Sequence, residues 1–417
     1  MKIKLAALLA AAVFSCTAAA TQAWADEPDG LVLPAGFHAA IVAEAIPGIR
    51  HLAVRSDGVL YASTTAPKGA ATPSGIVAIH LDANHHADKI EHFGNVQGGT
   101  GIRFDHGALY AATPTAIYRF TFGKNEMIPS APPQTVMEGM PATGFSNRPI
   151  AFDGKGNFYV VIGSEGNICG VAPAKGLKPV GQHPCPSLEN RAGVWQFKAA
   201  KTGQKFPVDG VQIVTGLRDM DALDWRAGDA LYGIMHDRNG THNTWPDLVS
   251  AEDESNIAEE MDRLVKGTNM GWPYTYYDEV RGVRLMAPEY GGNGKVSPPP
   301  GLYATPVVAF HPSHAAPLDM VFYQGSQFPK SYRGGAFVAR HGGLGAGGSG
   351  FDIQFVGFDA KGKPLTPVSF ASGFAGASMT AAKANYRPVG AAVGPDGSLY
   401  VADSQKGRIW RISYSGN

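Results

Sequence analysis

Arginine and histidine side chains recur at the ends of short apolar segments in this chain of 417 residues. The starts of these segments carry Arg50, His51, Arg148, Arg218, His314 and Arg387. The ends of the segments that follow carry Ser164, His236, Arg238, Arg340, His341, Asp403 and Lys406. Guanidinium groups bind carboxylates through two parallel hydrogen bonds, and imidazole accepts a proton near neutral pH. Taken singly, each arginine reads as a surface or ion-pair residue, but together around one opening they suit a planar polyanion.

The elements that must position these side chains follow a pattern that occurs six times. Each copy has a short apolar strand, a tight turn containing Asp, Gly or Asn, and a second strand that ends in Leu-Tyr or a close equivalent. The copies cover residues 51–61, 101–110, 149–159, 222–232, 317–337 and 388–400. A third apolar strand follows most copies, at residues 76–79, 117–120, 194–197, 353–356 and 409–412.

Such four-stranded units cannot bury both of their faces alone, and radial stacking of about four to eight units is the propeller solution. We therefore predict an all-β, six-bladed β-propeller in which residues 408–413 pair with a segment near residues 37–45 and close the ring. A pair of β-sandwiches is the alternative, but it does not explain six hairpins of the same order. In a hairpin, the first strand begins at the edge where the second ends, so the cations and imidazoles should face one mouth of the ring.

The first 25 residues read as a secretory leader. Met-Lys-Ile-Lys precedes an apolar run at residues 5–14, and Ala-Trp-Ala at 23–25 has the form of a cleavage site. A lipoprotein signal through Cys16 is the alternative. We assign residues 26–417 to one propeller domain, expect a periplasmic or secreted protein, and expect no transmembrane segment after the leader. The 35 basic and 35 acidic residues balance, which argues against a nucleic-acid partner.

Two cysteines remain after the predicted leader, Cys169 and Cys185, on either side of a loop rich in Gly, Pro and Lys. An even count in an oxidising compartment predicts a disulfide between them, with two unpaired thiols as the alternative.

The longest insertion, residues 236–273, is rich in carboxylates. They are Glu252, Asp253, Glu254, Glu259, Glu260 and Asp262. Oxygen-rich loops of this kind hold calcium in many proteins, but the spacing is not that of a defined calcium loop, so we favour a solvated acidic face. His236, Asp237 and His242 offer a weaker transition-metal interpretation, and the metal ligands remain unassigned.

Several motifs resemble the pyrroloquinoline-quinone-dependent sugar dehydrogenases of the glucose/sorbosone dehydrogenase family. They are Gly-Leu-Arg-Asp at 216–219, His-Asp-Arg-Asn at 236–239, Trp-Pro-Asp-Leu at 245–248, Gly-Trp-Pro-Tyr at 271–274, His-Ala-Ala-Pro at 314–317, Phe-Tyr at 322–323, Tyr-Arg-Gly-Gly-Ala-Phe at 332–337 and Gly-Arg-Ile-Trp-Arg at 407–411. The resemblance covers roughly residues 35 to 413, and the cysteine pair resembles one found in a bacterial branch.

The resemblance implies a quinoprotein that oxidises a sugar hydroxyl or hemiacetal by hydride transfer to pyrroloquinoline quinone, with calcium polarising the quinone. The implied cofactor-binding residues are Arg148, Arg218, Arg238, Arg340, Arg387, Lys406 and Arg408. The implied proton acceptor is one of His341, His314 and His236. The chain has no Cys-x-x-Cys-His heme motif, so electrons would pass to a separate acceptor.

The chain departs from the family at three positions. Phe145 stands where a histidine is usual, Asp219 stands where an asparagine is usual, and a glycine-rich stretch at 343–348 replaces a Ser-Trp-Asn-Arg sequence. Two hypotheses follow. The first is a working dehydrogenase in which a different histidine serves as the base. The second is a propeller without the cofactor that binds a glycan, a sugar or a protein at the same mouth.

Overall fold

Six antiparallel hairpins form where the repeated pattern predicts them. The computed structural model describes residues 24–65, 75–94, 98–171, 174, 177–343 and 350–416. Residues 1–23 of the predicted leader lie outside this part of the chain, and Trp24 begins the first strand. The tyrosine or phenylalanine that ends each hairpin pattern is buried, so each hairpin carries its own anchor into the core.

Each hairpin is the inner half of a blade of four or five strands. Blade 1 contains β4 (Ile49–Val54), β5 (Leu60–Thr64), β6 (Gly75–Leu81) and β7 (Ala87–Phe93). Blade 2 contains β8 (Ile102–Asp105), β9 (Ala108–Ala112), β10 (Ala116–Phe120), β11 (Gln134–Glu138) and the short parallel β17 (Gln204–Lys205). Blade 3 contains β12 (Ile150–Phe152), β13 (Asn157–Ile162), β16 (Gly193–Lys198), β18 (Val211–Thr215) and the short parallel β22 (Thr268–Asn269).

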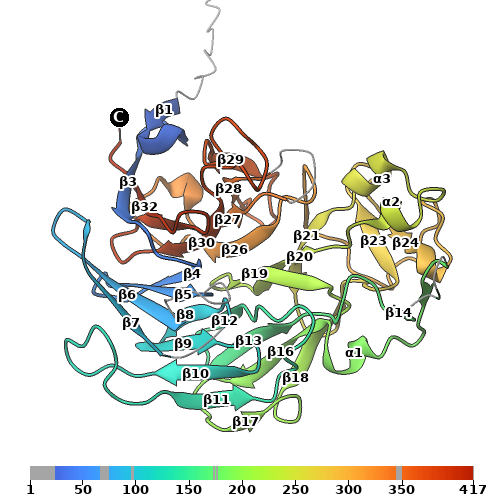
Figure 1. The fold of residues 1–417 in the computed structure, drawn as a ribbon, viewed down its shortest axis with the longest axis horizontal. Helices are drawn as coiled ribbons and strands as arrows, with labels where there is room; N and C mark the ends of the chain where they lie inside the picture. The colour runs from blue at the N-terminus through green and yellow to red at the C-terminus, as the bar shows by residue number, and fades with distance from the viewer. Residues whose placement is uncertain are drawn as a thin grey trace, which may run out of the picture.

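The last three blades complete the ring. Blade 4 contains β19 (Asp219–Trp225), β20 (Leu231–His236), β21 (Glu259–Leu264) and β25 (Val308–Phe310). Blade 5 contains β26 (Pro317–Phe322), β27 (Ala336–Arg340), β28 (Asp352–Val356) and β29 (Val368–Ala371). Blade 6 contains β30 (Pro388–Val393), β31 (Leu399–Asp403), β32 (Ile409–Tyr414) and β3 (Phe37–Ala43). The first strand of every blade lies toward the middle of the ring (Figure 1).

The ring closes through the chain ends. β3 pairs with β32 in antiparallel register from Phe37 opposite Tyr414 to Ala43 opposite Ile409, so the predicted closure and the all-β, six-bladed fold are confirmed. Each junction between neighbouring blades in the described chain is filled by a buried apolar cluster. Burial of one such large apolar side chain contributes roughly 1.5–3 kcal/mol, so the junctions hold the ring as a rigid frame.

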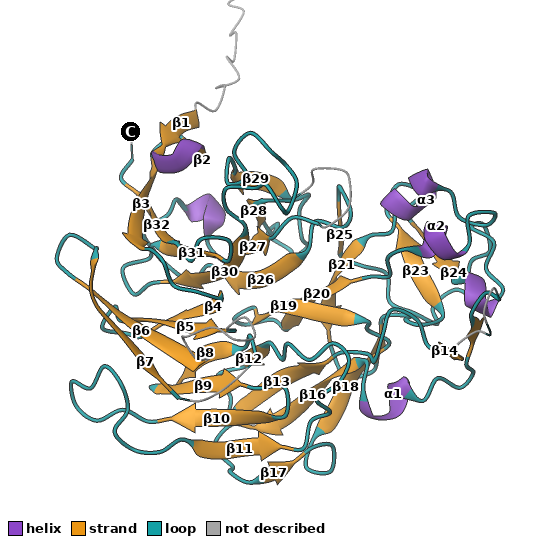
Figure 2. Ribbon diagram, in the orientation of Figure 1, coloured by secondary structure: helices purple, strands orange, loops and turns teal. Residues whose placement is uncertain are grey.

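Long insertions gather on one side of the ring, beside blades 3 and 4 (Figures 1 and 2). They contain β14 (Gly170–Val171), β15 (Val180–Gly181), α1 (Ser187–Asn190), α2 (Thr241–Thr244), α3 (Ala251–Ser255), β23 (Thr275–Asp278), β24 (Val283–Met286) and η2 (Pro288–Tyr290). The remaining elements are the hairpin of β1 (Trp24–Glu27) and β2 (Leu31–Pro34), η1 (Pro28–Gly30) and η3 (Lys330–Tyr332). None of the helices in the described ranges has the length and apolar character needed to cross a bilayer.

The predicted disulfide between Cys169 and Cys185 is confirmed. It closes the loop that carries β14 and β15, and the Tyr290 hydroxyl ties this loop to the blade 4 insertion by donating to the carbonyl oxygens of Cys169 and Gln182 at 2.7 and 3.0 Å.

Replacing both cysteines with serine should lower the free energy of unfolding by about 3 kcal/mol, because the unfolded chain regains the entropy of a loop spanning 16 residues. Thermal unfolding of the double variant and of the reduced wild type should give the same lowered transition temperature. An unchanged transition after reduction, with both thiols shown to be free, would contradict this expectation.

Candidate functional site

The strand registers bring residues predicted to form the site to one end of the ring. Asp219 at the start of β19 pairs with His236 at the end of β20, Pro317 pairs with Arg340, and Pro388 pairs with Asp403. The starts and ends of the inner hairpins of blades 4, 5 and 6 therefore share one edge, which we call the mouth.

Three cationic or imidazole groups form an arc along the mouth from blade 5 to blade 1. Arg387 donates from Nε to the carbonyl oxygen of His341 at 3.1 Å and from Nη2 to that of Gly342 at 2.7 Å. Burial and the neighbouring guanidinium of Arg50 lower the pKa of Arg387. Arg50 has no hydrogen-bond or ion-pair partner among the described residues. The cationic arc, Arg50, Arg387 and His341, therefore contains positive charge that the surrounding protein leaves without a paired anion.

Arg218 stands at the mouth between blades 3 and 4. Its Nε donates to Oδ1 of Asn167 at 2.9 Å, and its Nη1 donates to the carbonyl oxygen of His236 at 3.2 Å. Its guanidinium also lies over the ring of Phe145, 4.5 Å from the ring centroid. Phe145, the unusual residue at a position where the family has histidine, thus orients a cation.

Four of the predicted cofactor arginines have guanidinium groups committed to internal partners. Arg148 is buried and donates to the carbonyl oxygens of Pro114, Phe145 and Pro141. Arg238 forms a buried two-point ion pair with Glu289, and Arg340 forms one with Asp352. Arg408 pairs with Asp29 and Glu44. Because these contacts occupy the guanidinium groups within the fold, we leave the four arginines out of the proposed site. Lys406 is exposed over the ring of Tyr386 and remains a candidate.

The three candidate histidines differ in environment. His341 Nε2 is hydrogen-bonded to Oγ of Ser404 at 2.7 Å, and burial followed by the charges of Arg387 and Arg50 holds the pKa of His341 well below its usual value. His314 lies further out, and its Nε2 donates to the carbonyl oxygen of Glu254 at 3.0 Å. Of these two, only His341 lies within the cationic arc.

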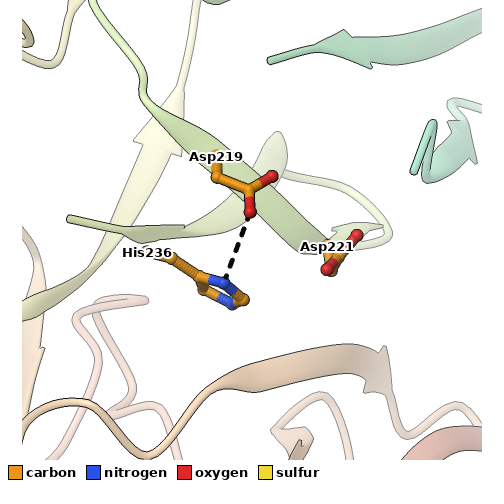
Figure 3. A group of neighbouring side chains, drawn as sticks. All are labelled: Asp219, Asp221 and His236. Carbon is orange, nitrogen blue, oxygen red and sulfur yellow. Dashed lines mark ion pairs between the residues drawn. The ribbon is translucent and has the colours of Figure 1, made fainter. Parts of the chain in front are cut away.

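The third histidine, His236, belongs to an acidic group at the same mouth. Its ligating nitrogen and the carboxylate oxygens of Asp219 and Asp221 all lie within 4.8 Å of one another (Figure 3). Burial opposes the charged imidazolium of His236, but the carboxylates of Asp219, Glu259 and Asp221 outweigh burial and raise its pKa. The sequence interpretation of a metal cluster from His236, Asp237 and His242 is therefore corrected, because the carboxylates that meet His236 come from β19.

A cavity of about 740 Å³ opens beside the acidic group and extends under the α2 and α3 insertion. Its wall includes Arg218, Asp219, His236, Asn239, Asn243 and His314. Amide, imidazole and carboxylate groups give hydrogen-bond donors and acceptors on several sides, which suits a polyhydroxylated ligand of moderate size.

The acidic insertion agrees with its sequence interpretation as a solvated face only in α3, where none of Glu252, Asp253 and Glu254 is buried. Glu259, Glu260 and Asp262 lie in β21 and are buried. Glu259 accepts hydrogen bonds from the backbone nitrogens of Ala315 and Ala316, and Glu260 pairs with Arg284. Glu259 therefore holds the loop that carries His314, whereas Glu260 is occupied by Arg284.

His51 makes the stability of the ring sensitive to acid. Its Nε2 donates to the carbonyl oxygen of Leu318 at 2.7 Å, whereas its buried Nδ1 has no partner, and burial lowers the pKa of His51 to about 4. The unfolded chain binds this proton at a pKa of about 6.5, so its contribution is lost as pH falls from about 6.5 toward 4.

We expect this single group to remove about 3 kcal/mol of stability over that interval. In His51→Gln, the difference in unfolding free energy between pH 7 and pH 4.5 should shrink relative to wild type. Denaturant unfolding at the two pH values measures this difference in unfolding free energy. A difference equal to that of wild type would show that His51 does not cause the loss of stability in acid.

With this geometry established, comparisons with known proteins identify the class of fold. Residues 300–415 match the family described as TrAA12-like. The holo form of the pyranose dehydrogenase PQQ domain from Coprinopsis cinerea superposes with a TM-score of 0.71 at 18% identity, over 92% of this chain and 97% of that one. The calcium structure of Trichoderma reesei carbohydrate-active enzymes family AA12 gives a TM-score of 0.73 at 17% identity, over 92% and 97%.

The PQQ-bound aldose sugar dehydrogenase of Streptomyces coelicolor has a TM-score of 0.54 at 16% identity, over 92% of this chain and all of that one. An uncharacterized protein of Borreliella burgdorferi is 28% identical over 206 residues, about half the length of each chain. The resemblance to the PQQ-dependent sugar dehydrogenases is thus confirmed, by fold across the propeller and by family match over residues 300–415.

Proposed function

We propose that this protein is a PQQ-dependent dehydrogenase that oxidises a hydroxyl or hemiacetal of a sugar at the mouth of the propeller. The observation that carries the proposal is that cations without a paired anion and an acidic group beside a polar cavity share the mouth. The folds of the AA12, pyranose and aldose sugar dehydrogenases support the reaction class.

The residues fit a quinone that carries three carboxylates. Arg50 and Arg387 lie close enough for their charges to interact, and neither has a carboxylate ion pair among the described residues. An anion placed between them would remove this repulsion. Arg50, Arg387, Arg218 and Lys406 would hold the carboxylates, and the calcium expected from the resemblance would polarise the quinone.

In this account the protein positions the sugar and moves one proton. When bound, the quinone would supply the hydride acceptor for the sugar carbon, and a separate electron carrier would take up the electrons. The hydroxyl proton would pass to His341, which burial and the charges of Arg387 and Arg50 keep neutral. The cavity wall, including Asn239 and Asn243, binds the remaining hydroxyl groups of the sugar.

We also propose that the protein is exported from the cytoplasm. A leader at residues 1–25 would export the protein to the periplasm or the medium, where the disulfide between Cys169 and Cys185 is stable. Fractionation of cells that express the full chain, with N-terminal sequencing of the product, tests this. Recovery of an uncleaved protein in the cytoplasm would contradict it.

Activity is tested by reconstituting the purified protein with the quinone and calcium, adding an electron-accepting dye, and supplying aldoses, sorbosone and polyols in turn. We expect dye reduction with at least one of these sugars, dependent on the quinone. No reduction with any sugar while the quinone is shown to be bound would overturn the proposed reaction.

A further inference from the structure

Each of the three side chains of the acidic group at the mouth has at least one polar atom without a hydrogen-bond partner among the described residues. Asp221 is 2% exposed, and its buried Oδ1 has no partner. The carboxylate of Asp219 receives no hydrogen bond from the described residues. Nδ1 of His236 lies 3.9 Å from Oδ2 of Asp219, beyond hydrogen-bond distance. Figure 3 shows the three side chains close together, with the ion pair between Asp219 and His236 drawn as a dashed line.

One further polar atom of His236 and one of Asp221 are fixed by hydrogen bonds to the surrounding protein. Nε2 of His236 donates to the carbonyl oxygen of Pro317 at 2.7 Å, which leaves Nδ1 with a lone pair directed at the carboxylates. Oδ2 of Asp221 accepts a hydrogen bond from Nδ2 of Asn147 at 2.9 Å, which leaves Oδ1 facing the group. A histidine whose far nitrogen donates to a backbone carbonyl, and a carboxylate fixed by an amide, are the usual supports of metal ligands.

Apart from His236, which forms an ion pair with Asp219, no cationic side chain of the described chain contacts these two carboxylates directly, and Arg50 acts on Asp221 only through its charge. Arg218 is adjacent in sequence to Asp219, but its guanidinium is held by Asn167, the carbonyl oxygen of His236 and the ring of Phe145. Two carboxylates at a buried position require either protons or a cation to offset their desolvation.

We propose that Asp219, Asp221 and His236 bind one divalent transition-metal ion, with Zn²⁺ as the reference ion, in preference to Ca²⁺. Oxygen and nitrogen ligands of Zn²⁺ lie about 2.0–2.2 Å from the ion, so neighbouring ligand atoms in a tetrahedral site are about 3.4 Å apart. The present separations of up to 4.8 Å close to this value by small side-chain rotations. Three protein ligands leave a fourth position open toward the cavity.

The preference for a transition metal follows from the ligand types. Ca²⁺ takes six to eight oxygen ligands, whereas an imidazole nitrogen with two carboxylates suits Zn²⁺ and similar ions. Asp219, which stands where the resembling family has asparagine, supplies the charge that makes such a site possible. Binding of the ion does not depend on the proposed function. A role for the ion beside a quinone does rest on the proposed function.

The test uses the full exported protein after EDTA treatment, without quinone or sugar. Zn²⁺ binding is measured by competition with a chromophoric chelator, and Ca²⁺ is offered in a parallel titration. We expect one Zn²⁺ per chain and at least 100-fold weaker binding of Ca²⁺. In Asp221→Asn and in His236→Gln the affinity for Zn²⁺ should fall by about 100-fold or more, as expected when a ligand rather than a supporting residue is lost.

Asp224→Asn is the matched control, because Asp224 is a carboxylate of the same strand that lies outside the group and accepts from the backbone nitrogen of Phe322. Its Zn²⁺ affinity should equal that of wild type, and circular dichroism should show all three variants folded. The proposal is overturned if wild type binds no Zn²⁺, if Ca²⁺ binds as tightly, or if either ligand variant binds like the control. Because no activity is measured, an inactive enzyme that binds Zn²⁺ would refute the proposed function alone.

Discussion

Replacing His341 with glutamine should lower kcat for sugar oxidation by about 10²–10⁴-fold while quinone binding is retained. His341 is the neutral imidazole of the cationic arc, because burial and the charges of Arg387 and Arg50 keep its pKa well below the usual value. Glutamine preserves a side chain that can bond to Ser404 but cannot accept the hydroxyl proton. Steady-state kinetics of the reconstituted variant measure the loss.

His314→Gln is the matched control for this prediction, since His314 donates to the carbonyl oxygen of Glu254 and lies outside the arc. Its kcat should change by less than about 10-fold. The low pKa of His341 has a second consequence: its neutral form persists at and above neutral pH, so the wild-type rate should show no titration of His341 between about pH 6 and 8. Equal losses in the two variants would remove His341 as the proton acceptor.

Replacing Arg50 with methionine should weaken quinone binding by about 30-fold or more, corresponding to the 2 kcal/mol or more usually lost when one partner of a close charge pair is truncated. Arg50 is the clearest choice, because it has no side-chain partner among the described residues and its removal leaves no protein group unsatisfied. Equilibrium dialysis of the quinone against wild type and variant gives the two dissociation constants.

Arg408→Met is the control for Arg50, because the guanidinium of Arg408 is already paired with Asp29 and Glu44. Quinone affinity should be unchanged in this variant, although some stability is lost with the ion pairs. A variant of Arg50 that binds the quinone like wild type, or a variant of Arg408 that loses binding, would place the cofactor elsewhere on the mouth.

The sequence predicts the architecture well because the propeller repeats a local signal. Each hairpin carries its own turn and its own buried aromatic anchor, such as Tyr61 or Tyr400, so the order of strands follows without long-range information. Ring closure follows from one further requirement, that the edges of the first and last sheets be covered, and β3 and β32 satisfy it.

The site is harder to predict from the sequence, because the residues that contact its side chains come from distant segments of the chain. Arg238 meets Glu289 and Arg340 meets Asp352, and nothing local indicates that these guanidinium groups are occupied. Asp221 is two positions after Asp219, a spacing that places both side chains on one face of a strand, so its role in the acidic group was within reach of the sequence. The hydrogen bond from Asn147 to Asp221 depends on the packing of blade 3 against blade 4, so it could not be predicted from the sequence.

The central claim is that the mouth of this propeller binds pyrroloquinoline quinone. Titrating the purified wild-type protein with the quinone in the presence of calcium, and following the quinone absorbance together with equilibrium dialysis, tests it most directly. The account predicts saturable uptake of one quinone per chain, weakened in Arg50→Met and unchanged in Arg408→Met. An absence of uptake under these conditions would contradict the account and favour a propeller that binds a glycan or a protein without the cofactor.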